Sequence, residues 1–197
     1  NISRSALAKS TITWPSEVLL KPTIGTIAYA TSNPTTFIRS GIDWYYTGSS
    51  TDNTCYTRWT TSEKEKSIYD PWPAGWRVPD GGSNSVWSKA LGSSSGFDYS
   101  YDFTNEGMNF SGKFGNASTI WYPASGYYFG SGWSGSHNND GDFYNVGEYG
   151  YYWSASTEED DDTHYDTYYM EFTHEDEVDF TTDYYRINGY SVRCMKE

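Results

Sequence analysis

The stretch at residues 147–194, GEYGYYWSASTEEDDDTHYDTYYMEFTHEDEVDFTTDYYRINGYSVRC, decides the fold that we expect for this chain. Its apolar residues alternate with polar ones in three short runs, at 168–172, 178–180 and 190–194. A two-residue period is typical of strands that bury one face. The sequence therefore predicts three short strands with a turn at residues 174–177 between the first two.

Tyrosines crowd the same stretch in larger numbers than three short strands could bury, and many aspartates accompany them. Tyrosine offers a wide, rigid contact surface with a polar tip and only two rotatable side-chain angles. We interpret the stretch as a face that binds a ligand rather than one that carries out chemistry, and we expect no catalytic residues. The candidate ligand-binding residues are Tyr144, Tyr149, Tyr152, Asp162, His164, Tyr165, Tyr168, Tyr169, Asp183, Tyr184, Tyr185 and Asn188.

The run at residues 149–153 divides between core and surface by the same alternation. Tyr149, Tyr151 and Trp153 are expected to share one face of a strand, with Trp153 in the core. Tyr152 and one of its neighbours are expected to be exposed.

Length and composition favour one domain with an aromatic core. The 197 residues contain no apolar run long enough to span a membrane, so we expect no membrane insertion. Aromatic residues make up 19% of the chain, and glycines punctuate it, which favours short strands and many turns. The predicted fold class is a β-rich α+β domain with short antiparallel strands, one or two short helices and long loops.

The remainder of the chain fits this class. Residues 1–22 are interpreted as an N-terminal linker or extension and residues 23–197 as the domain. Residues 23–30 alternate weakly and predict a strand, because Gly25 and the β-branched residues oppose a helix. Residues 86–91 have helical spacing, and Ser83 or Asn84 is the expected N-cap. Residues 97–103 and 108–114 are aromatic pieces punctuated by glycine, and further strands are expected at residues 120–124 and 127–133.

The formal net charge of −13 is concentrated in one half of the chain. No lysine or arginine lies between Lys113 and Arg186, and this window holds more than half of the 26 acidic side chains. Such a field repels phosphate backbones and anionic lipids, which argues against nucleic acid and membrane surfaces as partners. Cationic or neutral ligands, protein or carbohydrate, remain.

The sequence predicts neither a metal site nor a cofactor. The acidic run at residues 158–162 is an alternative calcium site, because clustered carboxylates suit calcium, but a solvated acidic loop explains it better. The three histidines are too dispersed in the sequence to predict a metal site. Cys55 and Cys194 could form one long-range disulfide or remain two buried thiols, and the sequence favours neither.

Four motifs, in order, carry a family resemblance. They are PAGWRVP at residues 73–79 with Trp87 following, YPASGY at 122–127, YNVGEYGYYWSAS at 144–156 and GYSVRC at 189–194. From about Asn33 to its C-terminus the chain resembles the Fibrobacter succinogenes major paralogous domain family. Many members of that family have a cysteine where this chain has Trp72.

The resemblance implies a C-type lectin-like fold on a bacterial surface lipoprotein or fimbrillin-type pilus tip. The same fold is used by variable proteins of diversity-generating retroelements, whose diversified region lies between a Tyr-Trp-Ser-like motif and a Val-Arg-Cys-like end. Residues 157–188 occupy that position here. Because the chain starts at Asn1 without a methionine, we expect it to be part of a larger, extracellular surface protein.

Three functions are therefore expected, in decreasing order. The first is a non-catalytic adhesin- or receptor-like module whose C-terminal binding face is diversified. The second is a structural pilus subunit of the fimbrillin type, for which the N-terminal extension would serve as a donor strand. The third is a calcium-dependent carbohydrate-binding lectin.

Overall fold

The computed structural model describes residues 16–19, 21–39, 45, 59–60, 65–83, 85–91, 98–111, 119–129, 143–161, 164–184 and 186–197. This part of the chain is β-rich, with two short helices and several small sheets. The predicted β-rich α+β class is confirmed at that level.

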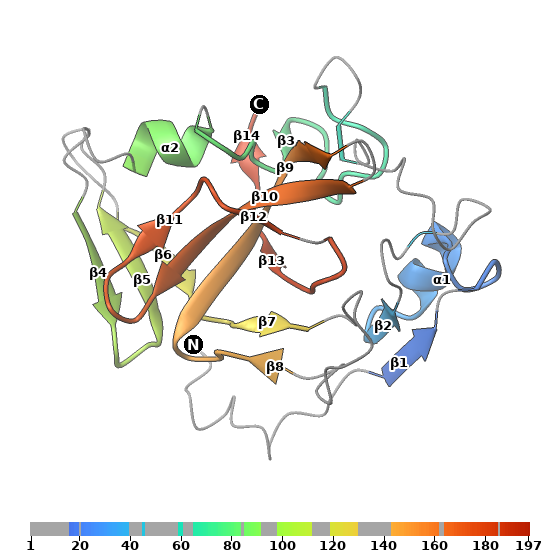
Figure 1. Ribbon diagram of the computed structural model, residues 1–197, viewed down its shortest axis with the longest axis horizontal. Helices are drawn as coiled ribbons and strands as arrows, with labels where there is room; N and C mark the ends of the chain where they lie inside the picture. Colours follow the sequence, from blue (N-terminus) through green and yellow to red (C-terminus); the bar gives the residue numbers. More distant parts are fainter. Residues whose placement is uncertain are drawn as a thin grey trace.

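A five-stranded sheet forms the centre of the molecule (Figure 1). Its two long strands, β9 (Tyr149–Asp161) and β10 (His164–Thr173), are antiparallel neighbours. The short strands β11 (Val178–Asp179) and β12 (Asp183–Tyr184) pair with β10, and β13 (Ser191–Val192) runs parallel to β9. Strands at residues 168–172 and 178–179 are thus confirmed, and the turn between them carries Asp176 in the left-handed region, at φ 61°.

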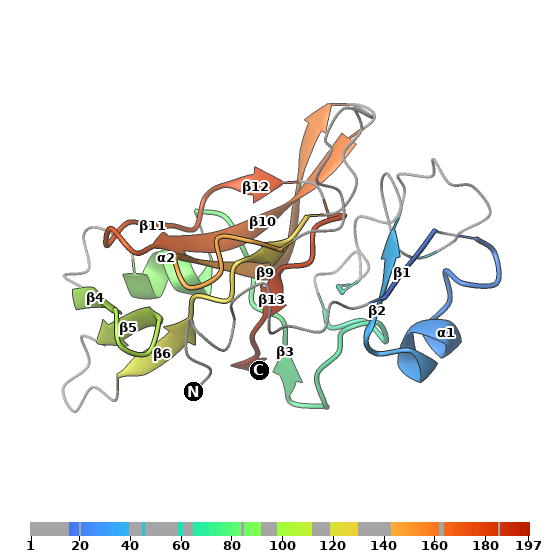
Figure 2. The same cartoon turned by 90° about the horizontal axis from the view of Figure 1, so that it is seen from below.

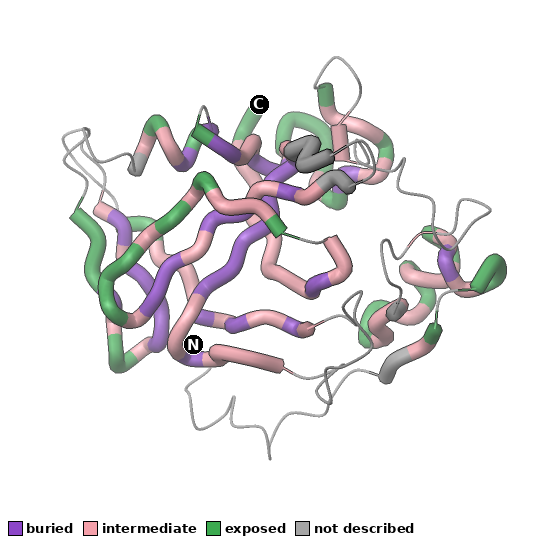
Figure 3. Tube along the Cα trace, in the orientation of Figure 1, coloured by how far each residue is buried: buried purple, intermediate pink, exposed green. Residues whose placement is uncertain are grey.

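The second layer is an antiparallel sheet of β4 (Asp98–Asp102), β5 (Gly107–Ser111) and β6 (Ile120–Pro123), with helix α2 (Val86–Leu91) beside it. Between the two sheets lies the main core, in which every large side chain is aromatic or methionine. Figure 3 shows the buried residues concentrated along β5, β9 and β10. The buried core residues are Trp87, Tyr101, Met108, Phe110, Ala124, Tyr152, Met170 and Phe172.

Helix α2 spans the predicted residues, but its N-cap is Ser85. The Ser85 hydroxyl, and not that of Ser83, accepts a hydrogen bond from the backbone N–H of Ser88 at 2.9 Å. Ser85 is fully buried, so its side chain serves only this local role. Asn84, the other predicted cap, lies outside the described residues.

The predicted strand at residues 23–30 is wrong. Residues Ile27–Ser32 form helix α1, because the Thr26 hydroxyl accepts a hydrogen bond from the Tyr29 N–H at 3.1 Å and the following alanines favour a helix. On either side of α1, β1 (Ser16–Leu19) and β2 (Thr36–Arg39) pair in parallel. Strand β1 therefore lies within the segment interpreted as a linker.

Phe37 joins this N-terminal unit to the rest of the molecule. Its ring stacks on Tyr128 with centroids 4.0 Å apart. Tyr128 belongs to β7 (Tyr127–Tyr128), which pairs with β8 (Phe143–Tyr144). In Figures 1 and 2 the unit of β1, α1 and β2 lies at one end of the molecule, away from the β4–β5–β6 sheet.

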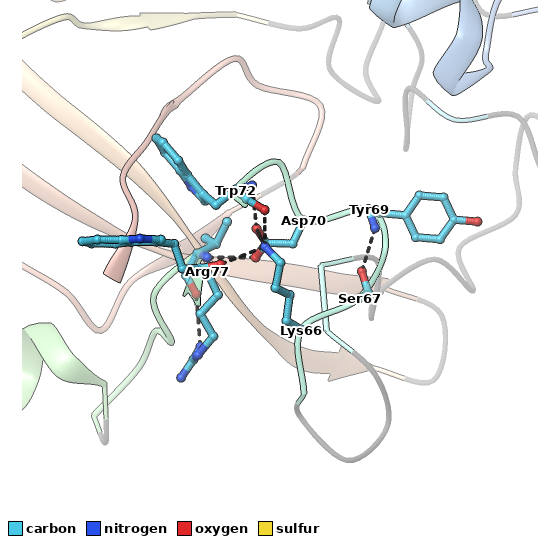
Figure 4. A network of polar contacts seen from close by, with 8 residues as sticks. Lys66, Ser67, Tyr69, Asp70, Trp72 and Arg77 are labelled. Carbon is cyan, nitrogen blue, oxygen red and sulfur yellow. Dashed lines mark hydrogen bonds and ion pairs between the residues drawn. The ribbon is translucent and has the colours of Figure 1, made fainter. Parts of the chain in front are cut away.

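A hydrogen-bond network around Asp70 shapes the proline-rich segment before α2 (Figure 4). One carboxylate oxygen accepts from the Lys66 ammonium at 2.7 Å and from the Trp72 N–H at 2.9 Å, and the other accepts from the Val78 N–H at 2.8 Å. Lys66 also donates to the Trp76 carbonyl at 2.8 Å. Next to this network, β3 (Trp76–Arg77) pairs with β14 (Met195–Lys196), which connects the segment to the C-terminus.

Residues 79–81 brace the central sheet where its register shifts. Opposite Tyr169 stands Trp153, but opposite Thr167 stands Thr157, so β9 carries two extra residues there. The Ala155 N–H donates to the Pro79 carbonyl at 2.8 Å. Gly81 lies so close to β9 that a Cβ on it would fall 2.3 Å from the Ser154 hydroxyl, which explains the glycine.

Candidate functional site

A second aromatic cluster covers the face of the central sheet opposite the main core. Tyr151 and Trp153 of β9 and Tyr169 of β10 form its buried base, each at most 7% exposed. The alternation of β9 explains the division, since Tyr152, between Tyr151 and Trp153, points into the main core. A single strand thus supplies both faces of the sheet with aromatic side chains.

Further tyrosines from five segments surround this base. Tyr127 contacts Tyr151 and Tyr190 edge-on at centroid distances of 4.9 and 5.6 Å, and Tyr190 stacks on Trp153 at 4.1 Å. The Tyr149 ring is parallel to that of Tyr151 at 5.9 Å. We call the whole set the tyrosine face; it consists of Tyr127, Tyr144, Tyr149, Tyr151, Trp153, Tyr169, Tyr184 and Tyr190.

Hydrogen bonds fix the orientation of these rings. The Tyr151 hydroxyl accepts from the Asn145 amide at 3.0 Å, and the Trp153 indole N–H donates to the Asn188 carbonyl at 3.2 Å. Asn145 adopts a left-handed backbone, at φ 55°, which asparagine tolerates well. Burial raises the pKa of Tyr151 and that of Tyr169 well above the ordinary phenol value, so both remain protonated at neutral pH.

One carboxylate stands within the tyrosine face. Glu171 is half-buried, lies opposite Tyr151 in the strand register, and accepts a hydrogen bond from the Tyr169 hydroxyl at 3.3 Å. Burial raises the pKa of Glu171, and the negative charges of Asp179 and Glu177 add to that rise. The site therefore combines rigid aromatic rings with a carboxylate that is partly withdrawn from water.

Beyond Glu171 the surface opens into a cleft of about 520 Å³. Its lining comes from β4, β10, β11 and the turn between the last two. The lining residues are Tyr99, Glu171, Thr173, Asp176, Glu177, Val178 and Asp179. Four of these seven side chains are carboxylates, so the cleft continues the negative charge of the tyrosine face outward.

Three predicted ligand-binding residues lie at the surface on or beside the tyrosine face. Tyr144 and Tyr149 are half-buried, and Tyr184 is 39% exposed. Asp183 is half-buried at the start of β12 but pairs with Tyr168, so it lies on the other side of the sheet. Tyr184 lies opposite Thr167 in the register of β10 and β12, two residues along β10 from Tyr169, so it lies on the side of the sheet that carries the tyrosine face. More than 30 positions of the sequence separate Tyr149 from Tyr184, so only the fold places both rings on this side.

Other predicted contacts are corrected by the structure. Tyr152, Tyr169 and Asn188 are 1%, 6% and 5% exposed, so they cannot present a surface to a large ligand. Tyr152 was expected at the surface but fills the main core. A Cβ on Gly82 would fall 3.3 Å from the Tyr168 ring, so Tyr168 packs beside Gly82, on the side of β10 opposite to Tyr169. Asp162 and Tyr185, together with the side chains of His164 and Tyr165, lie outside the described residues.

Sequence reasoning missed Tyr127, Tyr190 and Glu171 as parts of the site. Glu171 follows Tyr169 by two positions in an alternating strand, which is the signal that could have assigned it to the same face. Tyr127 could not have been found in this way, because only the fold brings β7 beside β9. Tyr190 belongs to a predicted strand, and its face depends on the parallel pairing of β13 with β9.

Metal and thiol chemistry receives little support from the described residues. Within them, no group of three or more histidine, cysteine, aspartate or glutamate side chains is arranged to hold a metal ion. Cys194 is a half-buried free thiol, and Cys55 lies outside the described ranges. The side chains of the acidic run at 158–162 are also outside them. In the part of the chain that the structure describes, no helix has the length and apolar character to cross a membrane.

The chain was also compared with known proteins. No family model matches it, and no curated protein or solved structure does so either. The resemblance drawn from the four sequence motifs therefore stays a prediction.

Proposed function

We propose that this chain is a non-catalytic ligand-binding module of a bacterial surface protein, with a C-type lectin-like fold and with the tyrosine face as its binding surface. The observation that carries the proposal is the tyrosine face itself, a second aromatic cluster on the side of the central sheet that the main core does not use. The rings that surround its buried base, Tyr127, Tyr149 and Tyr190, are only half-buried, so aromatic surface remains open to a ligand.

The rigidity of the rings supports recognition. Tyr127, Tyr149 and Tyr190 are each in contact with at least one other ring of the face, at centroid distances below 6 Å. Side chains that are already held in place lose little conformational entropy when a ligand binds. Phenol groups at the rim can donate or accept hydrogen bonds, while the ring faces supply apolar contact. This combination suits a protein or a carbohydrate ligand.

The face also fits a diversified receptor. Residues 157–188, the window implied by the resemblance, contribute Tyr169, Glu171 and Tyr184 to the face, whereas Tyr127, Tyr149 and Tyr151 precede that window. Under this proposal, changes within the window alter the ligand preference, and the earlier tyrosines keep the platform constant. The structural pilus subunit is the first alternative, and it depends on residues 1–22, of which the described strand β1 pairs with β2 of the same chain. The calcium-dependent lectin is the second, and it depends on side chains at 158–162, which lie outside the described residues.

A paired substitution tests the proposal. Purified chain is screened against arrays of bacterial and host glycans and surface proteins, and every ligand found is tested again with the double variant Tyr149→Ala/Tyr184→Ala. We expect at least a tenfold loss of affinity, because both rings lie at the rim of the face. The control is Phe103→Ala, which removes an aromatic ring that is 71% exposed in the turn after β4. Equal affinity for the wild type, the double variant and the control would refute this function.

A further inference from the structure

The charge of the tyrosine face restricts the ligands that it can accept. Glu171 is the carboxylate within the face, and the charges that act on it belong to Asp179 and Glu177, which are both negative. A carboxylate that is partly removed from water is unfavourable unless a positive group faces it. The chain itself supplies no lysine or arginine between Lys113 and Arg186, the stretch that contains all of β9, β10, β11 and β12.

The second oxygen of Glu171 is where such a positive group would bind. Oε2 accepts the hydrogen bond from the Tyr169 hydroxyl, which holds the carboxylate in place against the buried base of the face. Glu171 is also one wall of the open cleft of about 520 Å³. A ligand group that enters the cleft thus reaches Glu171 without displacing any ring of the tyrosine face.

The walls of the cleft fit the shape of a long basic side chain. Val178 and Tyr99 offer apolar surface for its methylene groups. Asp179 lies opposite Glu171 in the register of β10 and β11, so the two carboxylates are neighbours in the wall of the cleft. Aromatic rings at its border add an attraction for a cation through their negative ring faces.

We propose that the ligand of the tyrosine face is a protein with a basic surface segment, and that one of its lysine or arginine side chains enters the cleft and pairs with Glu171. The inference rests on the proposed binding function and specifies its ligand class. A negatively charged face selects such a partner by charge complementarity, which increases the association rate and excludes acidic partners. The aromatic rings beside the cleft would then contact the peptide backbone and neighbouring side chains of the partner.

The probe for this inference is a decapeptide of alternating lysine and glycine, with an Nε-acetyllysine version as the neutral control. Binding is followed through the backbone amide signals of the isotope-labelled chain. We expect saturable shifts in β10, β11 and β12 with the lysine peptide, and at least a tenfold weaker affinity with the acetylated one. Raising the salt concentration from about 20 mM to about 300 mM should weaken binding severalfold, because the shorter Debye length screens the attraction between the lysines and the carboxylates.

Glu171→Gln is the decisive variant and Glu175→Gln its matched control. Both remove one negative charge from a glutamate, but Glu175 is exposed in the turn after β10 and does not line the cleft. We expect at least a tenfold loss of peptide affinity for Glu171→Gln and less than a twofold loss for Glu175→Gln. Unchanged near-ultraviolet circular dichroism confirms that each variant is folded.

Several results would overturn the inference. The first is an equal loss of peptide affinity in Glu171→Gln and Glu175→Gln, and the second is an acetylated peptide that binds as tightly as the lysine peptide. The third is a lysine peptide that does not bind at all. The fourth is n-butylammonium that binds as tightly as the lysine peptide, which would indicate a site for small amines. The binding function is judged separately through Tyr149→Ala/Tyr184→Ala. If an array ligand is lost in that double variant but retained in Glu171→Gln, the tyrosine face binds ligands and only the assigned ligand class is wrong.

Discussion

Removal of the Asp70 carboxylate should destabilise the whole domain more than any exposed charge does. The Asp70 side chain is 1% exposed and that of Lys66 is 19% exposed. In Asp70→Ala the Lys66 ammonium loses its counter-charge, and the N–H groups of Trp72 and Val78 lose their acceptors. Breaking a buried ion pair from one side costs about 3–5 kcal/mol, and the lower end applies because Lys66 retains some contact with water.

The expected loss of about 3 kcal/mol in the free energy of unfolding corresponds to a melting temperature about 6–12 °C lower for a domain of this size. Urea unfolding measures the free energy, and calorimetry measures the melting temperature. The control is Asp80→Ala, which breaks the Arg77 ion pair at 2.7 Å; Asp80 is 42% exposed, so the loss should stay below about 1 kcal/mol.

A double-mutant cycle separates the ion pair from the backbone contacts. Lys66→Met alone leaves the carboxylate bonded to two N–H groups, and Lys66→Met combined with Asp70→Ala removes both charges. We expect the double variant to be less destabilised than the sum of the two single variants by about 1–3 kcal/mol. Two results would show that the network around Asp70 does not hold the segment in place. One is additive losses in the free energy of unfolding, and the other is a loss in Asp70→Ala no larger than that in Asp80→Ala.

Three further outcomes follow from the geometry. Glu171→Gln should raise the melting temperature at neutral pH, because the raised pKa of Glu171 makes its ionised form unfavourable in the folded state. This gain should vanish as the pH falls to about 4, and a lower melting temperature at pH 7 would contradict the prediction. Gly150→Ala should lower the free energy of unfolding by about 1–3 kcal/mol, because the new Cβ would fall 2.2 Å from the Phe172 ring. Gly75→Ala should lower it by only about 1 kcal/mol, because a Cβ there meets nothing within 4 Å and only the left-handed backbone opposes it. Urea unfolding should rank the two variants in this order. Burial raises the pKa of Tyr151, Tyr152 and Tyr190 in the folded state. The melting temperature should therefore fall as the pH rises above about 10, which is the phenol pKa in the unfolded chain. A constant melting temperature up to pH 11 would refute that burial.

The alternating pattern predicted the central strands because burial of one face is a local property of the sequence. Met170 and Phe172 alternate with polar residues, and both are fully buried in the main core. The same reasoning failed at Tyr152, where three consecutive aromatic residues offered no polar residue to mark the outer face. Since both faces of β9 are aromatic, the sequence period alone could not decide which ring is exposed.

The candidate site could be predicted only in part because its members meet through long-range pairing. Tyr149 and Tyr184 were expected at the surface, and both lie there. Tyr127 reaches the face through β7, whose backbone pairs with Gly189 more than 60 residues later. The strand expected at residues 23–30 failed for a local reason, because the single hydroxyl of Thr26 begins a helix that the β-branched residues seemed to oppose.

The four motifs contain six of the eight rings of the tyrosine face, whereas Tyr169, Glu171 and Tyr184 lie between the motifs. Pro79 bonds to β9 at its register shift, Trp153 lies in the base of the tyrosine face, and Arg193 lies over the Tyr122 ring at 4.6 Å. Glu171 and Tyr184 belong to no motif, and neither one packs in the main core. A scaffold held by the motif residues can accept changes at positions 171 and 184 at little cost in stability, because those changes leave the buried side of β9 and β10 intact.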